Sequence, residues 1–316
     1  MRHTPLRARL SGLFLLPFLL LPAACGGSEA DSAAEGSGGS VTVEHAQGST
    51  TVEGTPEKIV VFDVGYLATL DELGVKVAGV PAVENLPGDL AEYSGDTYPK
   101  VGSLFEPDYE KVNALAPDLI VVAGRSAAAY PELKKIAPTV DLTVDQTDFV
   151  GSFRARTEAL GRLVGKEDQV GQRLSALDQS IADVRGRADE RTGLIVLTTG
   201  GKISAHGPGG RFGIVHDVLG VKPAATGLKT DTHGNAVSHE FIAETDPDLL
   251  YVVDRDAAIG EEGQAAAQVL DNALVKQTEA AKNDKIVYLD AFTWYIAPTA
   301  LGSVESMVKA VGDSLA

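Results

Sequence analysis

EKVNALAPDLIVVAGR, residues 110–125, recurs in altered form as EFIAETDPDLLYVVDR at residues 240–255. Without a gap the two stretches are identical at six of sixteen positions, including the first glutamate, the central Pro-Asp-Leu and the final arginine. Each stretch predicts a helix, a turn limited by proline and a buried strand. Coincidence at a Pro-Asp before a strand is the alternative, but a unit that recurs after 130 residues indicates two lobes of like construction.

An arginine ends each copy of the repeat, Arg125 in the first and Arg255 in the second. Ligands of open α/β sheets bind beyond the carboxyl ends of the strands, so we expect these two arginines to face each other across a cleft between the lobes. Arg211 is a third candidate, because the glycines of HGPGGRFG (206–213) let backbone N–H groups approach a ligand, and a helix is expected from Phe212. Arginines from both lobes of an acidic protein predict an anion-binding cleft; solvated surface arginines are the alternative.

Strand and helix patterns alternate around the repeat. The predicted strands are 59–62, 77–80, 119–123, 194–197, 249–253 and 286–289, and the predicted helices are 67–73, 109–115 and 301–315. This alternation predicts parallel sheets covered by helices on both faces. A hairpin is predicted at 41–52, whereas residues 148–187 have helical periodicity alone. The predicted fold class is therefore α/β, with two lobes joined by helices.

The first 24 residues have the order of an export signal. Arginines precede an apolar run at 13–21, and Pro-Ala-Ala leads to the single cysteine, Cys25. The run is too short to span a bilayer, which takes about 20 residues, so a transmembrane anchor is the weaker alternative. The stretch resembles a bacterial lipobox, in which the cysteine becomes lipidated and is the first mature residue. Residues 26–40 lack large apolar side chains and predict a flexible tether.

The whole chain is predicted to have five parts. These are a signal peptide at 1–24, a tether at 25–40, an N-terminal α/β lobe at 41–147, connecting helices at 148–187 and a C-terminal α/β lobe at 188–316. Hydrophobic residues make up 44% and charged residues 22%, which is typical of a globular protein. The formal net charge of −17 would fall to −20 when three arginines leave with the signal. Such a surface repels nucleic acid, so DNA or RNA binding is not expected.

Catalytic motifs are missing from the sequence. It contains no GxSxG elbow, no P-loop and no HExxH pair, and its one cysteine lies in the signal region. Because no nucleophile is visible, an enzyme is not expected. Two further residues are candidates for a binding site: His233, in a polar loop with a glycine, and Tyr295, after the strand 286–289. Solvation of the loop and plain packing are their alternative roles.

The run from Asp246 to Ala297 resembles a known family. It contains PDLLYVVDRDAAIG, LDNALVKQTEAAKNDKIVYLD and TWYIAP, which are similar to the catecholate-siderophore branch of the iron-siderophore solute-binding lipoproteins of ABC transporters, the group for ferric enterobactin, bacillibactin and petrobactin. The resemblance extends from about residue 41 to 315. It implies two Rossmann-like lobes joined by a long rigid helix, the class III periplasmic-binding-protein fold. After the tyrosine the family often has small-Gly-Gly, whereas this chain has Ala-Pro-Thr at 297–299, which predicts a less mobile loop.

The resemblance also assigns residues to the site. In the family, an arginine in VVDR, one in GxRFG and one in a Gly-Arg turn of the first lobe bind the anionic complex; these correspond to Arg255, Arg211 and Arg125. The family's histidine before glycine and its Trp-Tyr tyrosine can ligate iron that a tetradentate siderophore leaves open, and they correspond to His233 and Tyr295. The implied ligand is an Fe(III)-siderophore complex, and no cofactor is implied.

The function implied by the resemblance is that of a lipid-anchored substrate-binding protein on the extracytoplasmic face of the cell membrane. As a monomer it would bind a ferric catecholate siderophore and deliver it to an ABC permease with its ATPase. Related receptors use one glutamate per lobe to meet arginines of the permease, and Glu110 and Glu240 match; complementing the dipoles of helix starts is their alternative role. The alternatives for the chain are a receptor for another ferric siderophore, haem or a corrinoid, and an anchored α/β enzyme.

Overall fold

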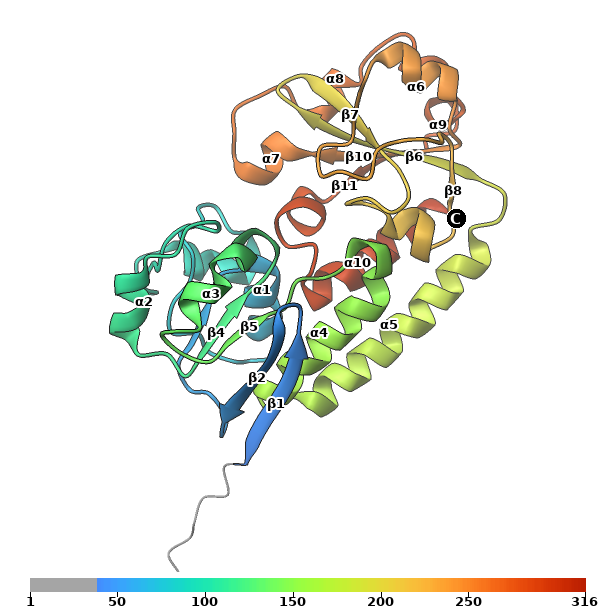
Figure 1. The fold of residues 1–316 in the computed structure, drawn as a ribbon. Coiled ribbons are helices and arrows are strands. Elements are labelled where there is room, and N and C mark those ends of the chain that lie inside the picture. Colours follow the sequence, from blue (N-terminus) through green and yellow to red (C-terminus); the bar gives the residue numbers. More distant parts are fainter. Residues whose placement is uncertain (1–38) are drawn as a thin grey trace, which may run out of the picture. The chain divides into compact units, whose positions relative to one another are not determined.

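The computed structural model describes residues 39–316, which are drawn in colour in Figure 1. The predicted signal peptide at 1–24, the lipidation candidate Cys25 and nearly all of the predicted tether lie outside the described residues. Ser40, which the sequence assigned to the tether, already pairs with Glu53 in the first hairpin. The described residues therefore begin, after Gly39, with a strand.

The N-terminal lobe is built on parallel strands. Its elements are β1 (Ser40–His45), β2 (Gly48–Glu53), β3 (Ile59–Val61), α1 (Val64–Glu72), α2 (Tyr109–Leu115), β4 (Leu119–Val122), α3 (Tyr130–Leu133) and β5 (Thr139–Asp141). β4 lies between β3 and β5 in parallel register, and the β1–β2 hairpin forms a separate antiparallel pair. Alternate residues of β3 and β4 belong to two different hydrophobic cores, one on each face of the sheet. This explains why their apolar runs are continuous.

The C-terminal lobe contains a mixed sheet. Its elements are β6 (Thr192–Thr199), β7 (Lys202–His206), β8 (Lys222–Pro223), β9 (Asn235–Val237), α6 (His239–Thr245), β10 (Leu249–Asp254), α7 (Arg255–Ile259), α8 (Ala266–Val269), α9 (Glu279–Lys282) and β11 (Ile286–Leu289). The strand order is β11-β10-β6-β7-β9, with β8 beside β6. β6, β10 and β11 are parallel, but β7 is antiparallel to both β6 and β9. The expectation of a wholly parallel sheet was wrong here, because Gly200 and Gly201 both adopt positive φ (54° and 73°) and close a hairpin.

The predicted strand at 77–80 is also wrong. These residues form only isolated bridges, in which Gly79 pairs with Val60 and Val80 pairs with Lys100. Pro81 follows at once and has no N–H to extend a ladder. The segment therefore lies beside β3 without forming a continuous strand.

Two turns differ from their predicted places. The pattern of the hairpin at 41–52 predicts a turn at Gln47-Gly48-Ser49, but the turn is at residues 46 and 47, because Gly48 already begins β2. The helix expected from Phe212 begins two residues later, at Ile214, because residues 211–213 form a turn; it is a π-helical turn, Ile214–Val218. Both differences are shifts of a residue or two at an element's end, where sequence patterns are weakest.

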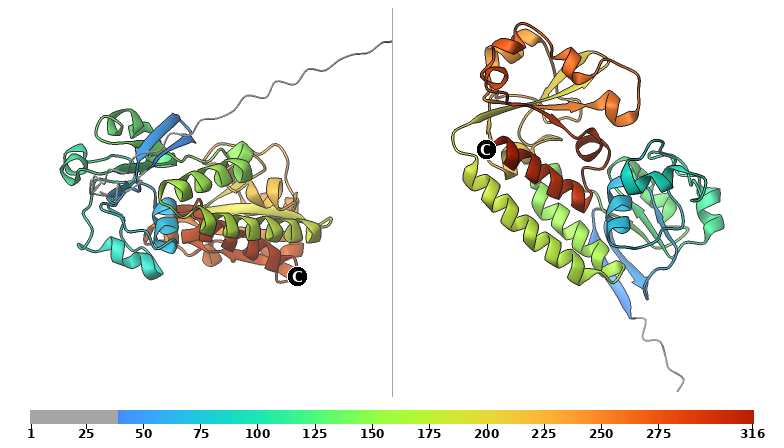
Figure 2. Two further views of the ribbon diagram at one scale, coloured as in Figure 1. Left: turned by 90° about the horizontal axis from the view of Figure 1, so that it is seen from below. Right: turned by 180° about the vertical axis from the view of Figure 1, so that it is seen from behind.

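Long helices connect the lobes. These are α4 (Phe149–Leu163) and α5 (Glu167–Arg187), as the helical periodicity predicted. α4 packs on α5, and α10 (Leu301–Ser314) packs on α5 and also reaches α1. The three helices lie side by side in the views of Figure 2. One core holds the buried face of α5 and that of α10, so the connection is a packed layer and not a single exposed strut.

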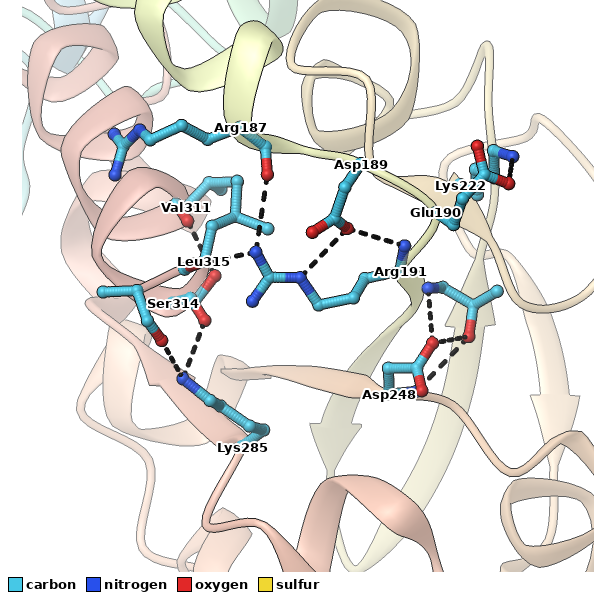
Figure 3. Close-up of polar contacts among 12 residues, drawn as sticks. Arg187, Asp189, Glu190, Arg191, Lys222, Asp248, Lys285, Val311, Ser314 and Leu315 are labelled. Carbon is cyan, nitrogen blue, oxygen red and sulfur yellow. Dashed lines mark hydrogen bonds and ion pairs between the residues drawn. The ribbon is translucent and has the colours of Figure 1, made fainter.

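The end of α5 is fastened to the end of the chain (Figure 3). Arg191, just beyond α5, donates to the carbonyl oxygen of Leu315 at 2.7 Å and to the carboxylate of Asp189 at 3.1 Å. The ammonium of Lys285 donates to the carbonyl oxygen of Ser314 at 3.1 Å. These bonds join the segments just before β6 and β11 to the end of α10.

Candidate ligand site between the two lobes

A cavity of about 430 Å³ lies where the N-terminal strands end and loops of the C-terminal lobe approach. Its lining residues are Asp63, Ala123, Gly124, Arg125, Thr143, Val144, Gln146, Phe149, Arg211, Thr230, Thr232, Pro298 and Thr299. The N-terminal members follow β3, β4 and β5, in keeping with the rule that open α/β sheets bind ligands beyond the carboxyl ends of their strands. Arg125 and Arg211 bring one positive charge from each lobe.

Arg125 lies in the turn that follows β4. Gly124 before it has a φ of 44°, a left-handed backbone that favours glycine. The guanidinium of Arg125 donates to the backbone carbonyl oxygens of Tyr295, at 2.9 Å, and Ile296, at 3.2 Å. These acceptors are neutral, so they orient the guanidinium without cancelling its charge.

Arg211 comes from the glycine-rich loop of the C-terminal lobe. It donates to the carbonyl oxygen of Tyr295 at 2.8 Å, and its guanidinium carbon lies 3.9 Å from the centre of the Tyr295 ring. Burial lowers the pKa of Arg211, and Tyr295 partly offsets this effect. The loop is held by Asp217, whose carboxylate accepts the N–H of Gly209 at 2.6 Å. A Cβ at Gly213 would come within 2.5 Å of that carboxylate, so glycine is required there.

Arg255 begins α7 and does not line the cavity. Its Nε donates to the hydroxyl of Tyr295 at 3.1 Å. Its Nη1 lies 3.3 Å from the carboxylate of Glu261 and 3.6 Å from that of Asp256. The two repeat arginines, Arg125 and Arg255, therefore meet through Tyr295, one at its carbonyl and the other at its hydroxyl.

Tyr295 is the residue that all three candidate arginines contact. It belongs to a π-helical turn, Phe292–Ile296, that precedes α10. Burial raises the pKa of its phenol, but the hydrogen bond from Arg255 and the charge of Arg211 lower it by more, so the pKa lies below the ordinary 10.0. The two arginines therefore make the phenolate, a hard oxygen donor, easier to form than in an ordinary tyrosine.

His233 is the neighbour in sequence of a residue that lines the cavity. Its side chain is exposed and does not line the cavity, although the adjacent Thr232 does. The backbone N–H of His233 donates to the carboxylate of Asp231 at 2.9 Å, which fixes the loop. Within residues 39–316 no group of three or more His, Cys, Asp and Glu side chains could hold a metal ion. The loop of His233 thus reaches the site, but no hydrogen bond joins its imidazole to Tyr295 in the described chain.

The sequence reasoning missed Asp63 and Thr299, which line the same cavity. Asp63 follows the predicted strand 59–62 directly, so the rule that pointed to Arg125 could have found it. Thr299 gave no signal in the sequence, because its approach depends on the packing of α10 against α1.

Glu110 and Glu240 have equivalent positions in the two lobes. Each is the second residue of its helix, α2 or α6, and each side chain is exposed. The preceding caps, Asp108 and Ser238, accept backbone N–H groups of those helices. Neither glutamate lines the cavity, so each is available to a surface contact.

Comparison with known proteins gives a consistent result. A family model described as periplasmic binding protein matches residues 59–292. The petrobactin-binding protein YclQ of Bacillus subtilis is 45% identical over 281 residues, which cover 87% of this chain and 88% of YclQ. The ferric-anguibactin-binding protein FatB of Vibrio anguillarum is 32% identical, with 85% of each chain covered. Among the described residues, no helix has both the length and the apolarity needed to cross a membrane.

Two solved structures have the same fold over nearly their whole length. The crystal structure of YclQ matches with a TM-score of 0.82 and 44% identity, covering 88% of this chain and 99% of that chain. The periplasmic catecholate-siderophore binding protein VctP of Vibrio cholerae matches with a TM-score of 0.82 and 34% identity, covering 86% and 99%. The match therefore includes both lobes and the helices that connect them.

Proposed function

This chain belongs to the periplasmic binding protein family, and we propose that it binds a ferric catecholate siderophore and passes it to the permease of an ABC importer. Its two α/β lobes with a helical connection have the class III fold that the sequence predicted. Because the family and the relatives above are binding proteins, the chain is a binding protein and not an enzyme. The names of YclQ and VctP support a catecholate complex as the ligand.

The observation that carries the proposal is the contact of three arginines with Tyr295 beside the cavity. A ferric catecholate is both aromatic and anionic, and a planar, weakly hydrated guanidinium can stack on it as well as donate to its oxygens. An arginine about 4 Å from a negative charge gains roughly 4 kcal/mol of gross attraction at an effective dielectric of about 20. Desolvation removes much of this gain, yet nanomolar binding needs only about 12 kcal/mol in all.

We further propose that Tyr295 and His233 complete the iron shell when the siderophore supplies four donor atoms. The lowered pKa of Tyr295 supports the first ligand, and the approach of the Thr232 loop to the cavity supports the second. A hexadentate siderophore leaves no vacant position on the iron. Tyr295→Phe should therefore weaken a tetradentate bis-catecholate complex and hardly change a hexadentate one.

The cellular arrangement is part of the same proposal. Cys25 would carry the lipid that anchors a monomeric receptor to the extracytoplasmic face of the cell membrane. Glu110 and Glu240, exposed at equivalent helix starts, would contact the two permease subunits. Their support is the equivalence of the two positions across the lobes.

Fluorescence titration tests the ligand. Trp294 is buried beside Tyr295 and its ring centre lies 6.4 Å from that of Phe212, so its emission should respond to an iron complex at the site. We expect ferric catecholates to bind far more tightly than a neutral ferric trihydroxamate or haem. Arg125→Gln should lose roughly 2–4 kcal/mol of binding free energy, whereas Arg162→Gln, which changes an exposed arginine on α4, should lose none.

Equal affinity for the neutral trihydroxamate would contradict a catecholate receptor and favour a receptor for another siderophore class. Tight binding of haem alone would favour a haem receptor. Loss of affinity in the Arg162 control would show that the arginines act through general charge and not through the site.

A further inference from the structure

A carboxylate lies among the cations of the cavity. Asp63, between β3 and α1, is 7% exposed and lines the cavity together with Arg125 and Arg211. A cavity that only held an anion would gain nothing from a negative charge, because like charges at short range repel. The position of Asp63 therefore indicates that the ligand has a second recognised group, of a kind that a carboxylate can bind.

One oxygen of Asp63 is used by the protein itself. Its Oδ1 accepts the N–H of Tyr66 at 3.1 Å, which caps α1, and the hydroxyl of Thr299 at 3.4 Å. A Cβ at Gly65 would come within 2.3 Å of the Thr299 hydroxyl and 3.0 Å of Asp63 Oδ1. Glycine at position 65 thus leaves room for the bond that joins α1 to the loop before α10.

The other oxygen, Oδ2, receives no hydrogen bond within residues 39–316, because both bonds to the carboxylate are made at Oδ1. Since Asp63 belongs to the lining of the cavity, we infer that Oδ2 is the oxygen open to a ligand. Burial raises the pKa of Asp63 above its ordinary value, and the Tyr66 N–H and the charge of Arg125 offset this increase only in part. A cationic donor from the ligand would satisfy both the free oxygen and the buried charge.

We propose that Asp63 is a specificity residue, whose Oδ2 accepts a hydrogen bond from a protonated amine in the siderophore's linker. The inference rests on the proposed function and adds a requirement to it. The arginines hold the anionic iron centre, while Asp63 selects complexes that carry an ammonium group beside that centre. Neither arginine can make this selection, because a guanidinium has donors only.

Two synthetic ferric bis-catecholates provide the test. Both carry catechol amides joined by linkers of equal length, and one linker contains a secondary amine where the other has a methylene. The arginines alone would favour the methylene linker, because its complex has one more net negative charge. We expect wild-type protein to bind the amine complex about tenfold more tightly, and Asp63→Asn to reduce this preference to less than about threefold.

Matched variants separate specificity from helix capping. Asp108 caps α2 as Asp63 caps α1, and it lies outside the cavity lining, so Asp108→Asn should keep the full preference. Thermal unfolding of each variant checks the fold, and the wild-type preference is measurable even if a variant does not fold.

The outcomes distinguish this inference from the function on which it rests. Tight binding of both complexes with no preference for the amine, or a preference that survives Asp63→Asn, would overturn the role of Asp63 while supporting a catecholate receptor. Failure of both complexes to bind would overturn the proposed function itself, and the role of Asp63 with it.

Discussion

The first repeat, α2 and β4, and the second repeat, α6 and β10, have the same local construction in different lobes. Each helix begins at a capping side chain and ends at a left-handed residue, Ala116 with a φ of 47° and Asp246 with a φ of 43°. Each then leads into a buried strand that lies between two parallel neighbours. Neither left-handed residue is a glycine, so the shared backbone is imposed by the packing of helix on strand in both lobes.

The arginines that end the two repeats have different partners. Arg125 donates to backbone carbonyl oxygens, whereas Arg255 forms ion pairs with Glu261 and Asp256. The repeat thus determines where each guanidinium lies, and neighbours outside the repeat determine how much of its charge remains for a ligand. Three changes would break or sharpen this comparison.

The largest effect is expected from reversing the charge of the two equivalent glutamates. Glu110→Lys together with Glu240→Lys should abolish siderophore uptake by cells, because both proposed permease contacts would become repulsive. Ligand affinity of the isolated protein should stay unchanged, since neither residue lines the cavity. Uptake of radioactive iron as the siderophore complex and fluorescence titration measure the two quantities.

A double control isolates docking from helix stability. Glu132 and Glu167 are also exposed carboxylates in first helical turns, of α3 and α5. Reversing both makes the same change in net charge and in helix-dipole complementarity, and should leave uptake intact. Transport by the Glu110 and Glu240 double variant, or a loss of ligand binding in it, would show that the glutamates are not docking contacts.

A smaller effect, in the opposite direction, is expected at the second arginine. Glu261→Gln removes a carboxylate that would compete for Arg255 with the proposed ligand, so the affinity for a ferric catecholate should rise roughly threefold to tenfold, about 1 kcal/mol. Glu262→Gln makes the same change in net charge at the next exposed residue and should alter affinity much less. Equal gains in affinity in both variants would mean that the ion pair between Glu261 and Arg255 has no effect of its own on ligand affinity.

The smallest effect concerns the left-handed residues. Ala116→Gly should raise the free energy of unfolding by about 0.5–1 kcal/mol, because glycine adopts positive φ without steric cost. Asp246→Gly should not give this gain. The carboxylate of Asp246 accepts the N–H of Glu279 at 2.7 Å, and the substitution would remove this hydrogen bond. Urea denaturation measures both. A gain of equal size at Asp246 would show that its side chain contributes nothing.

Much of the fold was predictable because local sequence patterns determine its helices and strands. The helix at 109–115 and the strand at 286–289 have the predicted bounds, and the buried strands of both lobes lie where apolar runs occur. The β6–β7 hairpin was not predicted, because its turn signal is only Gly200-Gly201 between polar residues. The three-residue strand β5 was too short to give any periodicity.

The site was predictable as a set of residue types but not as an arrangement. Arg125, Arg211 and Arg255 were identified from strand ends and from a glycine-rich loop. Their meeting point at Tyr295 was not, because it depends on contacts between segments as far as 170 residues apart in the chain and on a π-helical turn that has no sequence signature. Asp63 was overlooked although it follows a predicted strand.

The carbonyl oxygen of Tyr295 accepts hydrogen bonds from Arg125 and from Arg211, at 2.9 Å and 2.8 Å. A ligand that these two arginines bound as proposed would have to compete with this carbonyl. A catecholate oxygen carries charge and forms a stronger hydrogen bond with a guanidinium than a carbonyl oxygen does, whereas a neutral complex offers no better acceptor. The carbonyl of Tyr295 would then act as an internal competitor, which discriminates against uncharged ligands without any repulsive group.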